Sequence, residues 1–598
     1  MDALAALPVA LPLLVAAFLV AIGPVSSRRL ADAVAVGTAA ATAVACAALL
    51  VASLDGPVVS WFGGWTPRDG IALGVAFTVD PVGAAVATLA GVLATAALTF
   101  TWRIFEAVRT LHHALMLVFL SAIVGFCLSG DLFNMFVFYE LLSVAAYALA
   151  GYRTTDPGSV RGALNFAVTN SVGAVLVLGG IALLYGRTGA LNLAQLGQSL
   201  ATAPADRLVV MAFLLLMVGF FVKAAVVPFH FWLADAYALA PAPVGVLFAG
   251  VVSELGLYAV ARVYWTVFSG PLAEVEGLRA VLLAGAAATA LVGGVMCLLQ
   301  HHLARMLAYA TVSHVGLTLA GFALFVPVGA GGAVLYLVAD GLVKGSLFAT
   351  TGIVDHHLHE VDERRLWGRG RHMPWAGALL AAGALGLAGV PPFGTFLGKA
   401  VMEEAASAAG HQWLVGLFVV VAALTSAALL RVTGRVFLGL GGPGPPAAPA
   451  PAAARHPHRH ATQLAPAVLL LVAAAAIGLV PGLAGAVEDA ADRFTDRQGY
   501  AAAVLQGAGN PPAGAHGPLH LAWPALWAAV SALLGLGLAA AAIHPERLPA
   551  GLRDRAGRAF APVAALLRGL HSGQLADSVT WLVVGMATFG TLLAVVLR

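Results

Sequence analysis

Cysteine, lysine and charged residues in general are scarce in this chain. The cysteines Cys46, Cys127 and Cys297 stand alone in apolar runs, and no C-x-x-C pair is present. This argues against an iron–sulfur cluster. No Walker A motif or dinucleotide fingerprint occurs, and the net charge of +3 is not clustered. We therefore expect no cofactor, no redox or catalytic centre and no nucleic-acid partner, so the chain must work from an ion gradient or from partner subunits.

Long apolar runs dominate what is present. The chain has 598 residues, of which 61% are hydrophobic and 10% charged, a composition that excludes a soluble globular protein. Runs of about 20 residues are long enough to cross the hydrocarbon core of a bilayer. The sequence predicts sixteen spans, near 3–25, 30–54, 75–100, 111–129, 131–150, 162–186, 208–238, 243–267, 278–299, 306–326, 330–354, 374–410, 412–438, 464–486, 519–543 and 576–597.

Arginine placement predicts how these spans are oriented. Most loop arginines follow odd-numbered spans, whereas loops after even-numbered spans hold only Arg68, Arg187, Arg207, Arg279, Arg493 and Arg497. Basic residues concentrate in cytoplasmic loops. We therefore expect a multi-pass protein of the cell membrane with both termini outside. The first run lacks a basic n-region and a cleavage site, so we interpret it as a retained span.

Composition and span spacing suggest five segments. These are an N-terminal three-helix segment (1–110), a first repeat of spans 4–8 (111–268), a second repeat of spans 9–13 (278–440), a flexible cytoplasmic linker rich in Pro and Ala (441–460), and C-terminal spans with a cytoplasmic loop at 544–575 (461–598). In that loop, residues 553–570 mix arginines and apolar residues at helical spacing. Such a helix lies on the membrane, against a neighbour or in solvent.

The only lysines, Lys223, Lys344 and Lys399, all lie inside apolar stretches. A lysine in a bilayer costs roughly 2.5–3.5 kcal/mol on insertion scales, and lysine loses its proton more readily than arginine when buried. This placement suggests proton handling. The alternative is that a GC-rich genome favours arginine codons and that the lysines reached helices by chance.

Two spans are too long and carry proline in the middle. They are GFFVKAAVVPFHFWLADA, with Pro228, and GVPPFGTFLGKAVMEEA, with Pro391 and Pro392. Broken helices next to a lysine indicate a transporter site. They fall five spans apart, which predicts two inverted five-span repeats.

Carboxylates accompany the lysines. Glu140 lies mid-span and is either paired with Lys223 or neutral and hydrogen-bonded to a neighbouring helix. Glu254 also lies mid-span. Asp340 and Lys344 are four residues apart, as are Lys399 and Glu403, so the members of each pair share a helix face. These pairs are either structural or part of a polar axis through the membrane.

Histidines extend this pattern. His230 follows the Pro228 break and is either a proton relay or structural, and His314 lies inside span ten, where it would bridge the two halves. His301 and His302 lie at the end of span nine. The exposed strings DHHLHE and HPHRH would bind metal only weakly, so we predict no metal site. Asp80 lies at a span end, where it is expected to cap a helix.

Four strings resemble one family. They are GDLFNMFVFYELL, VKAAVVPFHFWLADAY, HHLARMLAYATVSHVG and VADGLVKGSLF. They are similar to the antiporter-like subunits of Mrp-type cation/proton antiporters, respiratory complex I and membrane-bound hydrogenases, most of all to the D subunit of Mrp antiporters. The resemblance covers residues 75–440. It implies an all-α polytopic membrane protein with a 14-helix core of two inverted five-helix repeats and broken helices, plus about two extra C-terminal transmembrane helices.

The resemblance also implies roles. Glu140 would pair with Lys223, and protons would pass through Lys344 to a terminal site at Lys399. In our own hypothesis, Glu254, Asp340 and His314 tune or bridge this path, and His230 is a candidate proton relay. One position departs from the family, which usually has a lysine in span eight where GVVSELGLYAV places Glu254. The tail string HSGQLADSVTWLVVG is instead similar to the large hydrogenase and complex I subunits.

The leading hypothesis is a proton-translocating, antiporter-like subunit of a multisubunit membrane complex, with Na⁺/H⁺ antiport of Mrp type. Other membrane subunits and H⁺, with Na⁺ as the second ion, would be its partners. The first alternative is a proton-pumping subunit of a redox complex, and thus part of an oxidoreductase. The second is a scaffold that transports nothing. A chain with its own quinone site has no supporting motif.

Overall fold

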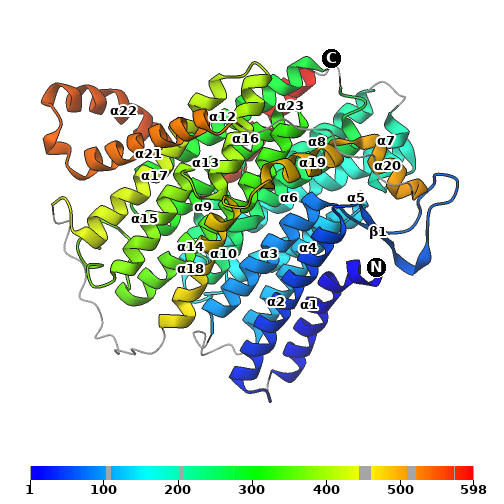
Figure 1. Cartoon of the computed structure of the whole chain (residues 1–598), viewed down its shortest axis with the longest axis horizontal. Coiled ribbons are helices and arrows are strands. Elements are labelled where there is room, and N and C mark those ends of the chain that lie inside the picture. Colours follow the sequence, from blue (N-terminus) through cyan, green and yellow to red (C-terminus); the bar gives the residue numbers. More distant parts are fainter. Residues whose placement is uncertain are drawn as a thin grey trace.

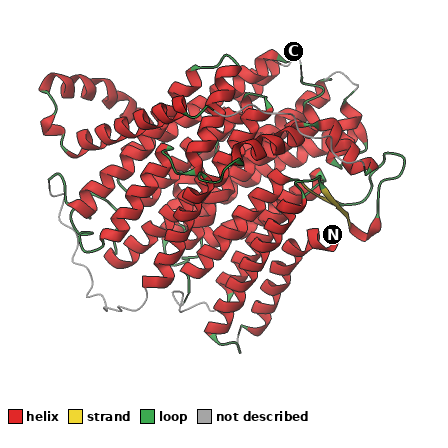
Figure 2. Cartoon of the chain, viewed as in Figure 1, coloured by secondary structure: helices red, strands yellow, loops and turns green. Residues whose placement is uncertain are grey.

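The chain is almost entirely helical (Figure 2). The computed structural model describes residues 2–23, 25–102, 110–201, 206–273, 275–442, 460–507, 520–571 and 573–596. Most of the predicted linker therefore lies outside the described residues, with the string HPHRH up to His460. Helices are the expected outcome, because apolar segments in a bilayer must satisfy their backbone hydrogen bonds internally.

The N-terminal part consists of three long helices and a small hairpin. Its elements are α1 (Asp2–Ile22), α2 (Arg28–Ala52), β1 (Val58–Trp61), η1 (Phe62–Gly64), β2 (Ala76–Val79) and α3 (Pro81–Phe100). Strands β1 and β2 are antiparallel, with Val58 opposite Val79. The sequence analysis did not predict this hairpin.

The next block contains the first broken helix. Its elements are α4 (Leu111–Leu128), α5 (Leu132–Ala150), α6 (Pro157–Thr188), α7 (Leu193–Leu200), α8 (Arg207–Ala224), α9 (Phe231–Leu239), α10 (Ala242–Leu247), η2 (Phe248–Val252), α11 (Ser253–Val263) and η3 (Tyr264–Phe268). The predicted span 208–238 is split into α8 and α9, and Pro228 lies in the gap. The segments η2 and η3 are π-helical turns.

Aspartates fix where several of these helices begin. The Asp80 carboxylate accepts the backbone N–H of Gly83 at 2.9 Å, which confirms the predicted cap on α3. Asp131, Asp156 and Asp206 cap α5, α6 and α8 in the same way. Such caps satisfy N–H groups that have no partner within the helix.

The second block repeats the pattern of long helices and a break. Its elements are α12 (Glu276–Leu299), α13 (Leu303–Ala323), α14 (Pro327–Leu358), α15 (Pro374–Ala388), α16 (Gly394–Ala408), α17 (Trp413–Val432) and η4 (Thr433–Leu438). The predicted span 374–410 is thus two helices separated at Pro391 and Pro392, as expected from its prolines. The inverted relation of the two blocks and their exact boundaries stay predictions.

The C-terminal part winds back over both blocks. Its elements are α18 (His460–Ile477), α19 (Leu483–Thr495), α20 (Arg497–Gln506), α21 (Ala522–Ile543), η5 (Pro545–Arg547), α22 (Ala550–Leu570) and α23 (Leu575–Val596). Figure 1 shows α22 standing out at one end of the molecule, while α23 returns to the helices of the first block. The predicted span 464–486 is shorter than expected, because α18 ends at Ile477 and turns.

Among the described residues, 14 helices are long and apolar enough to cross a membrane. The shorter apolar helices Pro374–Ala388 and Thr462–Ile477 account for the other two expected spans. The chain is therefore an integral multi-pass membrane protein.

Each break is covered by a helix of the C-terminal part. At the first break, the α-carbon of Gly585 in α23 is so close to Pro228 that a side chain there would collide with the proline ring. At the second break, Gly478 at the end of α18 approaches the Pro392 carbonyl in the same way. The C-terminal part thus closes both sites where the helical hydrogen bonding is interrupted.

Candidate functional site

The largest buried polar group centres on Lys344 of α14. Its ammonium forms an ion pair with Asp340, one turn earlier in the same helix, and lies 3.6 Å from Oε1 of Glu254 in α11. The side chains of Lys344 and Asp340 are fully buried, and that of Glu254 is 1% exposed. The i,i+4 spacing predicted the first contact, whereas the second joins two different helices.

Close helix packing brings Glu254 to this position. Gly250 in η2 and Gly341 in α14 face each other, and a Cβ on Gly341 would collide with the carbonyl oxygen of Gly250. Glycine therefore lets the two backbones cross in direct contact. Glu254 follows Gly250 by four residues and so extends from the crossing toward Lys344. The π-helical turn beside it is a feature often found at functional sites.

Histidine extends the cluster toward α13 and α17. Nδ1 of His314 lies 2.7 Å from Oδ1 of Asp340, and Nε2 lies 3.3 Å from the hydroxyl of Thr425. The hydroxyl of Tyr336 lies 3.0 Å from the same Nδ1. Four helices therefore contribute to one buried chain of polar groups, which we call the Lys344 cluster (Glu254, His314, Tyr336, Asp340, Lys344 and Thr425). Sequence reasoning missed Tyr336 and Thr425.

Glu254 is incompletely paired within this cluster. Neither of its carboxylate oxygens accepts a hydrogen bond from the described residues, and the ion pair at 3.6 Å is longer than a direct hydrogen bond. A buried carboxylate in this position is costly unless it is neutralised by a proton or a cation. Glu254 is therefore the member of the cluster best placed to accept one.

Lys223 has different surroundings. It ends α8, where the partial negative charge of a helix C-terminus favours a cation. Its ammonium donates to the Ser143 hydroxyl at 2.7 Å and lies 4.5 Å from the centre of the Tyr139 ring. These neighbours are neutral, so the amine is held by a hydroxyl and an aromatic face.

The expected direct pair of Glu140 with Lys223 is not formed among the described residues. Ser143 and Tyr139 turn toward α8, whereas Glu140 is only half-buried on α5. Its Oε1 atom is enclosed and accepts no hydrogen bond from the described part of the chain. Glu140 thus acts on Lys223 only at longer range. Ser143 could have been found from the sequence, since it lies one helical turn after Glu140.

Lys399 also points to a helix end. Its ammonium lies 3.4 Å from the carbonyl oxygen of Ala388, the last residue of α15. Glu403, one turn along α16, is buried, and neither of its oxygens has a hydrogen-bond partner among the described residues. The shared helix face therefore does not produce a direct ion pair here, because the lysine turns to the freed carbonyl at the break.

His230 meets a residue that no sequence pattern connected with it. Its Nε2 atom lies 2.9 Å from Nε2 of His571, which follows α22. His301 forms a separate group with the buried residues Glu363 and Arg431, and His302 caps α13. Among the described residues no three His, Cys, Asp or Glu side chains are grouped to hold a metal ion.

A second buried ion pair was missed by the sequence analysis. Arg262 of α11 pairs with Asp80, and its guanidinium lies 4.1 Å from the ring of Phe494 in α19. Asp80 therefore does more than cap a helix. The pair joins α3, α11 and the short helices α19 and α20.

Comparison with known proteins agrees with this geometry. The family model described as NADH:quinone oxidoreductase/Mrp antiporter, TM, matches residues 129–425, which include every predicted site residue. The N subunit of the NADH-quinone oxidoreductase of Desulforudis audaxviator is 33% identical over 419 residues, or 69% of this chain and 81% of that protein. The D subunit of the Na(+)/H(+) antiporter of Bacillus subtilis is 31% identical over 331 residues, or 55% of this chain and 66% of that one.

The fold gives the same result. A chain in the structure of the Mrp complex from a Dietzia species superposes with a TM-score of 0.74 and 29% sequence identity, covering 84% of this chain and 100% of that one. The buried lysines, the two broken helices and these similarities lead to one conclusion. The chain belongs to the NADH:quinone oxidoreductase/Mrp antiporter transmembrane family and is an antiporter-like subunit.

Proposed function

We propose that this chain translocates protons as a subunit of a multisubunit membrane complex, and that its reaction is Na⁺/H⁺ antiport of Mrp type. The observation that carries the proposal is the Lys344 cluster, in which an amine, two carboxylates and an imidazole lie within reach of one another and out of contact with solvent. A proton can pass between such groups without creating a new unpaired charge inside the membrane at each step.

The two outer lysines fit the ends of such a path. Lys223 lies in the last turn of α8, and the ammonium of Lys399 reaches the end of α15. Freed backbone carbonyls at such interrupted helices hold water or a cation. Glu140, Glu254, Asp340, His314 and His230 serve as tuning or bridging groups in this proposal. The assembly lies in the cell membrane with the N-terminus outside, as the arginine distribution predicts.

The ion partner follows from the relatives. The Bacillus subtilis protein is named a Na(+)/H(+) antiporter subunit. Glu254 supports the same assignment, since a buried carboxylate without a hydrogen-bond donor suits a cation or a proton. A second candidate is proton pumping in a redox complex, because the Desulforudis audaxviator relative is named an NADH-quinone oxidoreductase subunit. Other membrane subunits are partners in both cases.

Proton movement in inverted membrane vesicles tests the proposal. Vesicles containing the whole complex are energised, and a pulse of Na⁺ is followed with a pH-sensitive dye. Lys223→Ala is expected to abolish the response while the assembled complex persists in normal amount. Asp32→Asn is the matched control, because it neutralises another buried carboxylate, one that lies 2.8 Å from His113 and away from the Lys344 cluster.

Normal flux in Lys223→Ala vesicles contradicts proton translocation through this chain and favours the scaffold alternative. A response to an electron donor in place of Na⁺ assigns the chain to a redox-driven complex.

A further inference from the structure

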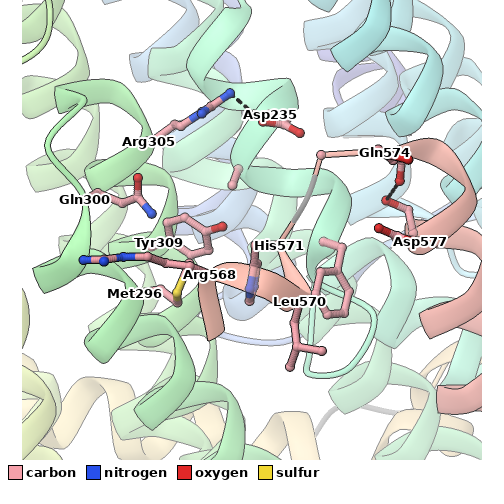
Figure 3. Close-up of a pocket in the computed structure, with 14 residues that line it drawn as sticks. Asp235, Met296, Gln300, Arg305, Tyr309, Arg568, Leu570, His571, Gln574 and Asp577 are labelled. Atoms are coloured by element: carbon pink, nitrogen blue, oxygen red, sulfur yellow. Dashed lines mark hydrogen bonds and ion pairs between the residues drawn. The ribbon is translucent and has the colours of Figure 1, made fainter. Parts of the chain in front are cut away.

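The C-terminal part contributes a side chain to the first helix break. His571 lies between α22 and α23, and its Nε2 atom is 2.9 Å from Nε2 of His230, the residue that starts α9. The two residues are 341 positions apart in the chain. Figure 3 shows His571 projecting from the C-terminal segment among the residues of α9 and α13.

Several contacts hold this segment in place. The side-chain amide of Asn165 donates to the carbonyl oxygen of Gly573 at 3.2 Å. Trp581 of α23 stacks on Phe231, with ring centres 5.5 Å apart. Further along α23, Phe589 packs against Phe229 and Phe221. The position of His571 therefore does not depend on its own contact with His230 alone.

The hydrogen bonds fix the protonation of the pair. Nδ1 of His571 lies 2.6 Å from the carbonyl oxygen of Leu567, and a carbonyl only accepts, so this nitrogen carries a proton. In the neutral ring Nε2 then has a free lone pair, and His230 donates its Nε2 proton to it. Nδ1 of His230 is left buried, without a hydrogen-bond partner among the described residues.

A polar cavity adjoins the pair. Its volume is about 200 Å³, which is enough for several water molecules. The titratable and charged groups that face His571 across it come from every neighbouring element: His230 and Asp235 at α9, Arg305 and Tyr309 on α13, Arg568 on α22, and Asp577 on α23. Arg305 and Asp235 form an ion pair at 2.9 Å, so the wall of the cavity is polar without a large net charge.

We propose that His230 and His571 form a two-histidine proton relay between this cavity and the break that follows Lys223. The proposal rests on the proposed proton translocation and adds to it the path by which protons pass at the cavity side. His571 has no counterpart among the groups that sequence reasoning assigned to the path.

The transfer is balanced for one proton. A proton that reaches Nδ1 of His230 turns that ring into a cation, and its Nε2 proton passes to Nε2 of His571. His571 then turns its Nδ1–H away from the Leu567 carbonyl and releases that proton to water in the cavity. Both rings end neutral with their tautomers exchanged, and the reverse sequence carries a proton inward. Histidine is suited to this because its two nitrogens accept and release protons near neutral pH.

Substitutions at His571 test the relay in vesicles containing the whole complex. His571→Gln keeps a side chain that donates and accepts but cannot carry a proton, and it should slow proton movement about tenfold or more, because a positioned proton-transfer group contributes roughly 10²–10⁴-fold. His571→Ala opens space beside the cavity, so added imidazole should restore its rate, and more so as the pH approaches that of imidazole ionisation. His544→Gln is the matched control, because His544 lies on the same segment and its imidazole forms a hydrogen bond with Glu546, away from His230.

The outcomes separate the relay from the proposed function. Wild-type flux in His571→Gln, together with no flux in Lys223→Ala, overturns the relay and leaves proton translocation intact. A slow His571→Ala variant that assembles normally and does not respond to imidazole shows a structural role and also overturns the relay. Normal flux in Lys223→Ala instead removes the proposed function itself.

Discussion

The two halves of the membrane domain each hold a buried lysine, but with different neighbouring groups. In the first half, the ammonium of Lys223 is held by the Ser143 hydroxyl and the Tyr139 ring. In the second half, Lys344 lies between the carboxylates of Asp340 and Glu254. A lysine among neutral groups gives up its proton without stranding a charge. One between carboxylates is held charged until a proton or cation arrives to replace it.

The segments that cover the two helix breaks also differ in whether they carry an ionisable side chain. The first break is covered by α23 and the preceding His571, whose ring can accept and release a proton. The second is covered by α18, which has no ionisable side chain after its first residue, His460. In the first half, the lysine has neutral neighbours and the helix break is covered by a segment with a titratable histidine. In the second half, the lysine lies between carboxylates and the break is covered by an apolar helix.

The largest expected effect is on stability, from Lys344→Ala. This change leaves Asp340 and Glu254 buried without their cation, and breaking a buried pair in this way costs about 3–5 kcal/mol. Lys223→Ala removes one hydrogen bond and a ring contact, and should cost only about 1 kcal/mol. The midpoint of thermal unfolding of the purified complex should therefore fall much further for Lys344→Ala.

The triple variant Lys344→Ala, Asp340→Ala and Glu254→Ala is the control. It removes the stranded carboxylates and should recover part of the loss. Equal shifts for the two single lysine variants would contradict the difference between the halves.

Glu254 offers a sharper test of the second half. Glu254→Lys introduces the residue that the family usually has at this position, but here it would place a second ammonium beside Lys344. We expect no proton movement and a reduced yield of the complex. Glu254→Gln keeps the shape of the side chain and should lower the flux roughly tenfold. Glu404→Gln is the matched control on an exposed position. Full activity of Glu254→Lys would show that the carboxylate has no part in the path.

The smallest expected effect is that the segment covering the first helix break, and not the one covering the second, docks less tightly at low pH. Burial lowers the pKa of His571 below its ordinary value of about 6.5, although the Leu567 carbonyl and the Asp235 carboxylate act in the opposite direction. The undocked segment therefore binds more protons than the docked one. Docking is fully stable above about pH 6.5 and weakens as the pH falls below that value.

Hydrogen exchange, corrected for the intrinsic effect of pH, measures this loosening. Protection of the backbone at 573–578 should decrease between about pH 6.5 and pH 5, while protection of α18 stays constant. In His571→Gln the decrease should disappear. Equal loss of protection in both covers would show that His571 does not control docking.

The sequence specified the fold well where a single segment determined the outcome. Apolar runs of sufficient length became helices, and Pro228 and the Pro391–Pro392 pair ended helices as expected, because proline lacks the N–H that continues a helix. The short helices α7, α19 and α20 and the hairpin β1–β2 were missed. They have 4 to 13 residues each and are too short for a hydropathy signal.

In the candidate site, contacts within one helix could be predicted from the sequence, whereas contacts between helices could not. The Asp340–Lys344 pair follows from a spacing of four residues on one helix. The approach of Glu254 to Lys344 depends on the glycine crossing of two helices, and the meeting of His230 with His571 joins opposite parts of the chain. Neither is encoded in local sequence.

The way α23 covers the first break has a consequence for biogenesis. Gly585 and Phe589 pack directly on Pro228 and Phe229, yet they are synthesised long after the residues that they cover. The first half of the membrane domain is therefore inserted long before its cover exists, and its polar interior stays open toward the lipid or the insertion machinery during that interval. A chain cut short before α23 would leave the break at Pro228 uncovered.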